Sequence, residues 1–433
     1  MNQRETLLEQ NGTLIIGGVR ADTLVEKYGT PLYVFDKEYT EKICEAYTSA
    51  LSTYYGKGYV SYASKAFCCK EIYRIIDKFN MHADVVSIGE MYTAVNAGFS
   101  PKKLTLHGNN KTEIELNYAL DNRIGKIVID SIDEISTLQS ICEAKGIVQK
   151  VLLRVNPGVE AHTHHYIQTA KIDSKFGFGL DNGDAEKAIN AILKCKNLDL
   201  IGLHCHIGSQ IFEIKSFILA LDKMTDYYAY CKKALNLSFS SLNLGGGFGI
   251  YYSGDDLKLK PIDYANYVKE ISNSLTDFAK AKQLELPELI IEPGRSIVGE
   301  SGVTLYKVGN VKEITNVKNY IAIDGGMFEN PRYALYQARY SVDIANKLNQ
   351  PKTVKYSIAG KCCESGDLIA EDVILPKAEK GDILAVYSTG AYNFSMASNY
   401  NRNLIPPVVS VYNGKSNVIV KGQLLDDIIS RDI

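Results

Sequence analysis

Short apolar runs recur between residues 59 and 292, and glycine, a polar residue or a charged residue lies at or just after the end of each run. Eight such runs predict buried β-strands: Tyr59–Ser64, His82–Val86, Leu104–His107, Ile127–Asp130, Val151–Val155, Ile201–Cys205, Ser241–Leu244 and Leu289–Glu292. Helical patterns lie between them, over Glu71–Phe79, Gly89–Ala97, Thr112–Asp121, Ile132–Lys145, Asp184–Lys194, Ile214–Ala234 and Pro261–Lys282. This alternation predicts an α/β fold, a (β/α)8 TIM-type barrel. A doubly wound open sheet is the alternative, but it would concentrate binding in one early Gly-rich turn.

After Glu292 the helical pattern fades, and short strands separated by turns follow. They are predicted over Val303–Val311, Tyr320–Asp324, Val354–Ala359, Ile383–Tyr387, Val408–Tyr412 and Asn417–Lys421. We expect a C-terminal, mostly antiparallel, barrel-like β domain, with which an early strand at Thr13–Ile16 could pair. The predicted domains are a barrel over 33–295 and a β domain made of 1–32 and 296–433.

Composition narrows the function classes. The chain has 433 residues, 45% of them hydrophobic, and a net charge of −2. That charge favours neither nucleic acid nor an anionic membrane as a partner. No apolar run is long enough to span a membrane, and Met1–Gln10 lacks the pattern of a signal peptide. The nine irregularly spaced cysteines therefore favour reduced thiols and a cytoplasmic location.

A barrel carries its chemistry at the carboxyl ends of its strands. The residues there are Lys65, Ser87 and Glu90, His107–Lys111, His204–Gln210, Gly245–Gly249 and Glu292–Arg295. Lys65 follows the first strand, where we expect poor solvation to lower the pKa of its amine. Such an amine can form a Schiff base with an aldehyde cofactor.

Gly245-Gly246-Gly247 allows close backbone approach, and its free N–H groups can bind an anion. In a barrel the loop after strand seven is a frequent phosphate site. Ser209 could add a hydroxyl to the same phosphate, and Gly294 and Arg295 another N–H and a charge.

His206 allows three interpretations: a ring that stacks on a planar cofactor, a metal ligand together with His204, or a hydrogen-bonded core residue. His162, His164 and His165 are further histidines in a loop. Glu292 follows an apolar run and is expected to be buried, so it must be paired or protonated. It could keep a pyridine nitrogen protonated, or form a salt bridge with Arg295 or a nearby lysine.

Seven motifs in order resemble the diaminopimelate decarboxylases, a family of pyridoxal-phosphate enzymes with the alanine racemase-like fold. They are Tyr62–Lys65, His107–Lys111, His204–Gln210, Gly245–Gly249, Glu292–Arg295, Cys363–Asp367 and Gly390–Tyr392. The resemblance runs from about Pro31 to Val409. It implies decarboxylation of meso-2,6-diaminopimelate to L-lysine and CO2, the last step of lysine biosynthesis, with pyridoxal 5'-phosphate as cofactor.

The resemblance also implies roles for individual residues. Lys65 would carry the Schiff base, His206 would stack on the pyridine ring, and Glu292 would lie on the ring nitrogen. The phosphate end would be held by Ser209, Gly247, the turn Glu292-Pro293-Gly294-Arg295 and Tyr392. The far carboxylate of the substrate would be bound by Arg295, Arg332 and Tyr336, with Tyr392 nearby, and its far ammonium by Glu364.

Cys363 is the implied proton donor to the alpha carbon, and it would enter with Glu364 from the partner subunit of a homodimer with shared active sites. Tyr333, after Arg332, stands where the family has proline, and Ala359–Cys362 is an unusual approach to Cys363. Four rival functions are compatible with some of the same residues. They are a decarboxylase for ornithine, arginine or lysine, a racemase, a metal-dependent hydrolase, and a non-catalytic regulatory homologue. A racemase would usually place a less acidic partner than Glu292 at the ring nitrogen.

Overall fold

The computed structural model describes residues 5–159, 175–253 and 262–433. His162, His164 and His165 lie outside the described residues. Contacts divide the chain into two compact units. The first contains residues 1–42, 250–261 and 295–433, and the second contains 43–249 and 262–294.

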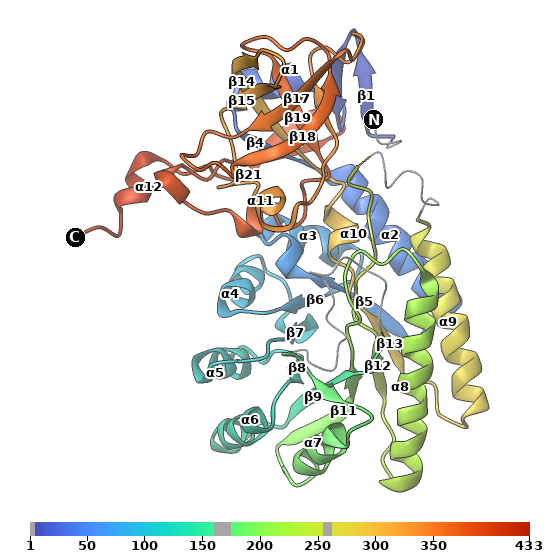
Figure 1. The fold of residues 1–433 in the computed structure, drawn as a ribbon. Helices are drawn as coiled ribbons and strands as arrows, with labels where there is room; N and C mark the ends of the chain where they lie inside the picture. The colour runs from blue at the N-terminus through green and yellow to red at the C-terminus, as the bar shows by residue number, and fades with distance from the viewer. Residues whose placement is uncertain (1–4, 160–174, 254–261) are drawn as a thin grey trace. The chain divides into compact units, whose positions relative to one another are not determined.

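The second unit is a closed barrel of parallel strands, as predicted (Figure 1). Its strands are β5 (Gly58–Ala63), β6 (His82–Val85), β7 (Leu104–Leu106), β8 (Lys126–Ile129), β9 (Gln149–Asn156), β11 (Leu198–His204), β12 (Ser241–Asn243) and β13 (Glu288–Ile291). They pair in this order, and β13 pairs back with β5 to close the ring. A short ninth strand, β10 (Phe178–Gly179), adds to β9.

Consecutive residues of these strands are buried on both faces, which explains why they read as continuous apolar runs. Val151, Leu152 and Leu153 of β9 are all 0% exposed. Residues on one face fill the barrel, and those on the other pack under the helices. Since every pairing around the ring is parallel, the carboxyl ends of all eight strands lie at the same end of the barrel.

The helices lie outside the strands (Figure 1). They are α2 (Lys37–Tyr54), α3 (Lys70–Lys78), α4 (Ile88–Asn96), α5 (Glu113–Asp121), α6 (Ile132–Lys145), α7 (Asp184–Ile192), α8 (Ile214–Ala234) and α9 (Tyr264–Ala281). Ser87, Thr112 and Ser131 cap the starts of α4, α5 and α6 by accepting a backbone N–H. Polar residues just after the strands therefore also begin the next helix.

The first unit contains a nine-stranded, mostly antiparallel sheet centred on β14 (Gly302–Ile314). Its other strands are β4 (Leu32–Asp36), β15 (Lys318–Ile323), β16 (Val342–Ile344), β17 (Val354–Ala359), β18 (Leu368–Leu375), β19 (Ile383–Tyr387), β20 (Val408–Tyr412) and β21 (Lys415–Val420). The pairs β15–β17 and β4–β20 are parallel. The unit also holds α1 (Ala21–Tyr28), α10 (Arg295–Val298), α11 (Arg332–Tyr336) and α12 (Leu425–Ile429).

The early strand differs from its expected pairing. β2 (Thr13–Ile16) pairs with β1 (Leu7–Gln10) and β3 (Val19–Arg20) in a separate three-stranded sheet. Leu14 and Ile16 are nevertheless buried in the same hydrophobic core as strands β4, β14 and β19. Residues 33–42, which the sequence assigned to the barrel, lie in the first unit, where β4 pairs with β14 and β20.

Two compositional expectations can be compared with the structure. None of the nine cysteines, all within the described ranges, forms a disulfide. Among the described residues, no helix combines the length and the hydrophobicity that a membrane span requires.

Candidate active site

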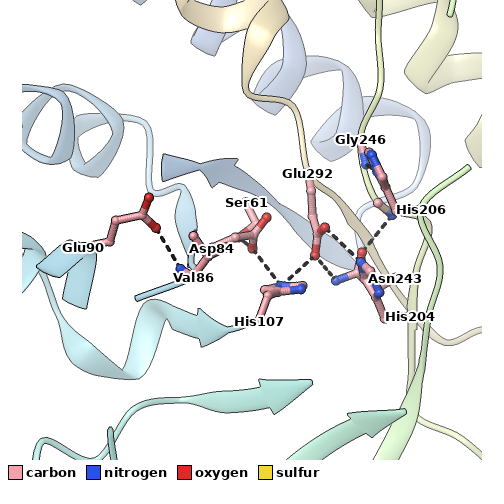
Figure 2. A network of polar contacts seen from close by, with 11 residues as sticks. Ser61, Asp84, Val86, Glu90, His107, His204, His206, Asn243, Gly246 and Glu292 are labelled. Atoms are coloured by element: carbon pink, nitrogen blue, oxygen red, sulfur yellow. Dashed lines mark hydrogen bonds and ion pairs between the residues drawn. The ribbon is translucent and has the colours of Figure 1, made fainter. Parts of the chain in front are cut away.

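Buried polar side chains converge at the carboxyl end of the barrel (Figure 2). Glu292 follows β13, His107 follows β7, His204 ends β11, and Asn243 ends β12. Glu292 Oε2 lies 3.1 Å from His204 Nε2, and Glu292 Oε1 lies 3.3 Å from His107 Nε2. Asn243 Nδ2 donates to Glu292 Oε1 at 2.5 Å. Three nitrogens therefore surround one buried carboxylate.

The partners of Glu292 correct one expectation. The sequence suggested that a structural role for this carboxylate would be a salt bridge to Arg295 or a nearby lysine, whereas its contacts in the barrel are two histidines and an asparagine. Asn243 was not singled out from the sequence. Its Oδ1 accepts from Gly245 N at 2.9 Å, so it connects the carboxylate to the glycine loop.

A second carboxylate lies beside His107. Asp84 Oδ1, on β6, is 3.7 Å from His107 Nε2, the same nitrogen that faces Glu292. Ser61 Oγ, on β5, donates to this Asp84 oxygen at 2.6 Å. All four side chains are buried. Figure 2 shows Asp84, His107 and Glu292 in a row, with His204 and Asn243 at the far side of Glu292.

The two histidines differ in protonation. Burial lowers the pKa of His107, but Glu292 and Asp84 raise it more, to about 9. Burial lowers the pKa of His204 to about 4, although Glu292 acts in the opposite direction. Burial would raise the pKa of Glu292, but the two histidines hold it well below its ordinary value. At neutral pH His107 is therefore a cation, His204 is neutral and Glu292 is an anion.

The glycine loop follows β12 and lies against its neighbours. A Cβ at Gly246 would be 2.0 Å from the carbonyl oxygen of Glu292, and a Cβ at Gly247 would be 2.3 Å from that of Gly208. Gly247 also has a φ of +115°, which L side chains rarely adopt. Only glycine allows this close backbone approach. The backbone N–H of Gly246 donates to His206 Nδ1 at 3.3 Å, which fixes the ring of the predicted stacking residue.

Lys65 lies in a 3₁₀ turn, η1 (Ser64–Ala66), directly after β5. Ser64 and Ala66 are buried, but Lys65 itself is exposed. The expectation of a poorly solvated amine was therefore wrong, because Lys65 lies in the turn after the strand and not in the buried strand itself. Burial first, and then the charge of Lys65, lower the pKa of His206, which keeps that imidazole neutral.

Other predicted strand-end residues have structural partners. Lys111 is buried and pairs with Glu134 on α6 at 2.6 Å. Ser87 caps α4, and Glu90 Oε2 accepts the backbone N–H of Val86 at 2.7 Å. Burial raises the pKa of Glu90 to about 7, against the opposing charge of Lys65.

The sequence suggested His204 and His206 as possible metal ligands, but the structure brings together a different group. His107, His204 and Glu292 each offer a ligand atom, and these atoms lie within 4.8 Å of one another, whereas His206 is not part of this group. A metal ligand must be a neutral imidazole. The cationic state of His107 therefore opposes metal binding at this cluster.

The same residues fit pyridoxal phosphate. Two carboxylates and one imidazolium leave the group of Asp84, His107, His204 and Glu292 with one net negative charge, which suits a protonated ring nitrogen. The N–H groups of Gly245 and Gly246 donate to Asn243 and His206, so the expectation of three free N–H groups is wrong, and Gly247 is the residue of the triple glycine that would approach a phosphate. Lys65 offers an exposed amine.

The first unit contains a second cluster of predicted residues, built around two buried arginines. Arg332 Nη1 donates to Tyr252 Oη at 2.9 Å and to Tyr340 Oη at 3.0 Å, and Arg295 Nη1 also donates to Tyr252 Oη. The Arg295 guanidinium lies 4.6 Å from the centre of the Tyr392 ring. Tyr252 and Tyr340 were not predicted from the sequence, because an isolated tyrosine carries no motif.

The remaining predicted residues of this unit are exposed. Tyr336, at the end of α11, is 45% exposed, and Cys363 and Glu364 lie in an exposed turn between β17 and β18. Asn401 Oδ1 accepts the backbone N–H of Cys363 at 2.8 Å. Tyr333, the departure from the family pattern, is buried and donates to Glu371 at 2.6 Å, so it has a local structural role.

Comparisons with known proteins identify the family of this chain. Residues 40–299 match the family model described as the pyridoxal-dependent decarboxylase, pyridoxal binding domain. The diaminopimelate decarboxylase of Bacillus subtilis is 47% identical over 98% of this chain and 96% of its own length, and that of Bacillus methanolicus is 47% identical over 96% of each. The crystal structure of diaminopimelate decarboxylase from M. jannaschii in complex with L-lysine superposes with a TM-score of 0.92, at 36% identity, and covers 99% of this chain and 98% of that one. The chain therefore belongs to the pyridoxal-dependent decarboxylases and, within them, to the diaminopimelate decarboxylase family.

Proposed function

We propose that this protein is a carboxy-lyase that decarboxylates meso-2,6-diaminopimelate to L-lysine and CO2 with pyridoxal 5'-phosphate as cofactor. This is the last step of lysine biosynthesis. The observation that carries the proposal is the buried Glu292, surrounded by two histidines and an asparagine at the carboxyl end of the barrel, in a chain 47% identical over nearly its whole length to a diaminopimelate decarboxylase.

The barrel residues divide the work of holding the cofactor. Lys65 would bind its aldehyde carbon through the exposed amine, and the neutral ring of His206 would stack on its plane. The phosphate end would be held by Ser209, Gly247, the turn Glu292-Pro293-Gly294-Arg295 and Tyr392. When bound, the cofactor supplies an electron sink that accepts the electron pair left by CO2, provided that its ring nitrogen is protonated. Glu292 is the residue that would hold that proton in place.

The substrate carries a second amino-acid head group that ornithine, arginine and lysine lack. Arg295, Arg332 and Tyr336 would bind its carboxylate, and Glu364 would bind its ammonium group. Arg332 is oriented by two phenols, and an arginine suits a carboxylate because its planar fork matches it in two parallel hydrogen bonds. These roles are proposals that rest on the motifs and on the arginine cluster of the first unit.

We also propose a cytoplasmic homodimer with shared sites. Cys363 and Glu364 would act in the partner's site, where the Cys363 thiol would return a proton to the alpha carbon. Their exposure is consistent with this role. The free state of all nine cysteines is consistent with a reducing compartment.

The first test compares kcat/KM for meso-diaminopimelate, lysine, ornithine and arginine. We expect a preference for diaminopimelate on the order of 10⁴, because analogues without the second carboxylate leave a buried charge unpaired. Arg332→Leu should raise KM for diaminopimelate and narrow the preference, while Arg339→Leu, at an exposed arginine nearby, should do neither. Equal wild-type activity on ornithine or lysine would overturn the substrate assignment and leave the cofactor assignment intact.

The second test concerns Lys65. Lys65→Ala should abolish turnover and the borohydride-stable attachment of cofactor, whereas Lys70→Ala, at an exposed lysine in α3, should retain both. Cofactor attached to a different lysine would contradict the assignment.

Mixing Lys65→Ala protein with Cys363→Ala protein should restore part of the activity if sites are shared between subunits. Absence of complementation, with subunit exchange verified by mass spectrometry, would show that each chain builds its own site.

A further inference from the structure

His107 is a cation in direct contact with Glu292, and its position is tightly defined. Its backbone N–H donates to Val85 O at 2.8 Å, which fixes the end of β7 against β6. The backbone N–H of Glu292 donates to Gly245 O at 2.8 Å, which fixes the other partner against β12. The backbone hydrogen bonds of the barrel therefore set the distance between the His107 and Glu292 side chains.

His204 serves as an internal comparison. Both histidines are buried, and each places its Nε2 within 3.3 Å of a Glu292 oxygen. His107 differs in that the same nitrogen also faces Asp84, at 3.7 Å. The second carboxylate thus distinguishes the histidine that holds a proton from the one that does not.

The charged and titratable groups around His107 come from four elements. Asp84 comes from β6, Glu292 follows β13, and Glu90 on α4 acts on it through its charge. The ring of His204 on β11 is 4.9 Å away, nearly perpendicular. Three of these four groups are carboxyl groups, so the surroundings favour an imidazolium.

We propose that His107 is a positioning residue whose imidazolium, held between Asp84 and Glu292, keeps Glu292 in the carboxylate form that a protonated ring nitrogen requires. This inference deepens the proposed function and rests on the assignment of Glu292 to the cofactor ring. Asp84 acts one step further away, because it supplies the charge that keeps the proton on His107.

The alternative protonation pattern makes a clear contrast. If His107 were neutral, the protein would hold two buried carboxylates with only neutral partners, and one of them would take up a proton. Should Glu292 be that carboxylate, it would no longer stabilise a proton on the ring nitrogen. In this proposal the protonation state of the cofactor ring would depend on His107 through Glu292.

The test measures the pKa of His107 in the cofactor-free protein by NMR, with histidine labelled at Cε1. The chain has seven histidines, and the missing signal of His107→Gln identifies the resonance. In the wild type we expect a midpoint near pH 9 for His107, several units above that of His204. A His107 midpoint at or below that of His204 would overturn the proposal, and this measurement requires no variant to fold except the one used for assignment.

Asp84→Asn is the diagnostic variant, because it removes the second charge and keeps the shape. It should lower the His107 midpoint by at least one pH unit and shift the basic limb of the kcat/KM profile to lower pH by a similar amount. His204→Gln, which removes the neutral histidine, should move the His107 midpoint far less. An unchanged His107 midpoint in Asp84→Asn would also overturn the proposal. If the wild type fails to bind pyridoxal phosphate, the proposed function is wrong. The titration of His107 is measured in the cofactor-free protein, so it tests the His107 proposal separately.

Discussion

Glu292→Gln is the substitution that tests the site most directly. It preserves the shape of the side chain and removes its charge. Glu292 faces three nitrogens, Asn243 Nδ2, His107 Nε2 and His204 Nε2, at 2.5, 3.3 and 3.1 Å. A carboxylate can accept from all of them, but a glutamine amide has one acceptor oxygen and an NH2 group that donates. The amide oxygen can take the place of Oε1, which faces Asn243 and His107, but the NH2 group then faces His204, whose neutral ring must accept at Nε2 instead of donating. The charge-assisted contact to His107 is lost in any arrangement.

The expected losses of stability and of activity follow from these contacts of Glu292. Loss of one charge-assisted hydrogen bond at a buried site should reduce the free energy of unfolding by about 2 kcal/mol. The effect on catalysis should be larger, because the variant cannot stabilise positive charge at the ring nitrogen. By analogy with removal of one preorganised electrostatic partner, we expect kcat to fall by about 10²–10³. Cofactor attachment to Lys65 should persist, since Lys65 lies on a different strand end.

The assay combines kcat for diaminopimelate, borohydride trapping of the cofactor and chemical denaturation, all on the same preparation. Asp84→Asn is the comparison variant, because it removes a buried carboxylate from the same row and leaves the Glu292 side chain in place. It should shift the pH profile of activity, whereas Glu292→Gln should lower kcat itself. A Glu292→Gln enzyme with kcat within tenfold of the wild type, and with cofactor attached, would refute the role of Glu292. Loss of cofactor attachment would instead point to a structural role in the barrel.

Three further predictions use other parts of the barrel. Gly246→Ala should lower the free energy of unfolding by about 1–3 kcal/mol and weaken cofactor binding, because the new Cβ would lie 2.0 Å from a backbone oxygen; Gly89→Ala, in α4 with no atom within 3.4 Å, should be neutral or stabilising in the same denaturation assay. His107 has a pKa of about 9 in the folded protein against 6.5 as its ordinary value, so its contribution to stability should be complete below pH 6.5 and lost as the pH rises to 9, a slope that His107→Gln should lack in unfolding curves measured across that range. Lys111→Met should destabilise the protein by about 3–5 kcal/mol because it leaves Glu134 buried and unpaired, and the double variant with Glu134→Gln should recover much of that loss in thermal unfolding.

The barrel was predictable because its strands are buried on both faces and therefore read as unbroken apolar runs. Among the strands that were missed, β18 and β4 illustrate two different reasons. β18 carries Glu371 and Asp372 at exposed positions, and its pairing with β17 shifts register twice, so its sequence does not alternate regularly. β4 is fully buried, but its neighbours β14 and β20 are distant in sequence, and nothing local assigns it to a sheet.

The site was predictable as a set of strand ends, although its internal contacts were not. Closure of the ring brings Glu292 to His107 and Asn243, and pattern alone does not reveal which strand-end residues will touch. Exposure was also misjudged at Lys65, which lies in a 3₁₀ turn after the strand and is exposed between two buried residues. The rule that barrel enzymes carry their functional residues at the carboxyl ends of the strands identifies the candidate residues. Which of these residues contact one another becomes clear only from the closed barrel.

The asymmetry between His107 and His204 explains how a buried anion can exist in this barrel at all. A carboxylate without charge compensation would take up a proton on burial. Two protonated histidines would overcompensate Glu292, and two neutral ones would leave it unsupported. Asp84 resolves this, because it favours a proton on one histidine only, and burial raises its own pKa to about 6, with Glu292 adding to the effect, so that it is mostly ionised at neutral pH. The group then keeps one net negative charge, and a cationic ring nitrogen is the ligand that neutralises it. In our proposal, side chains from at least four strand ends together favour a protonated ring nitrogen on the cofactor. Substitutions at His107 or Asp84 should therefore change that preference, although neither residue is proposed to contact the cofactor.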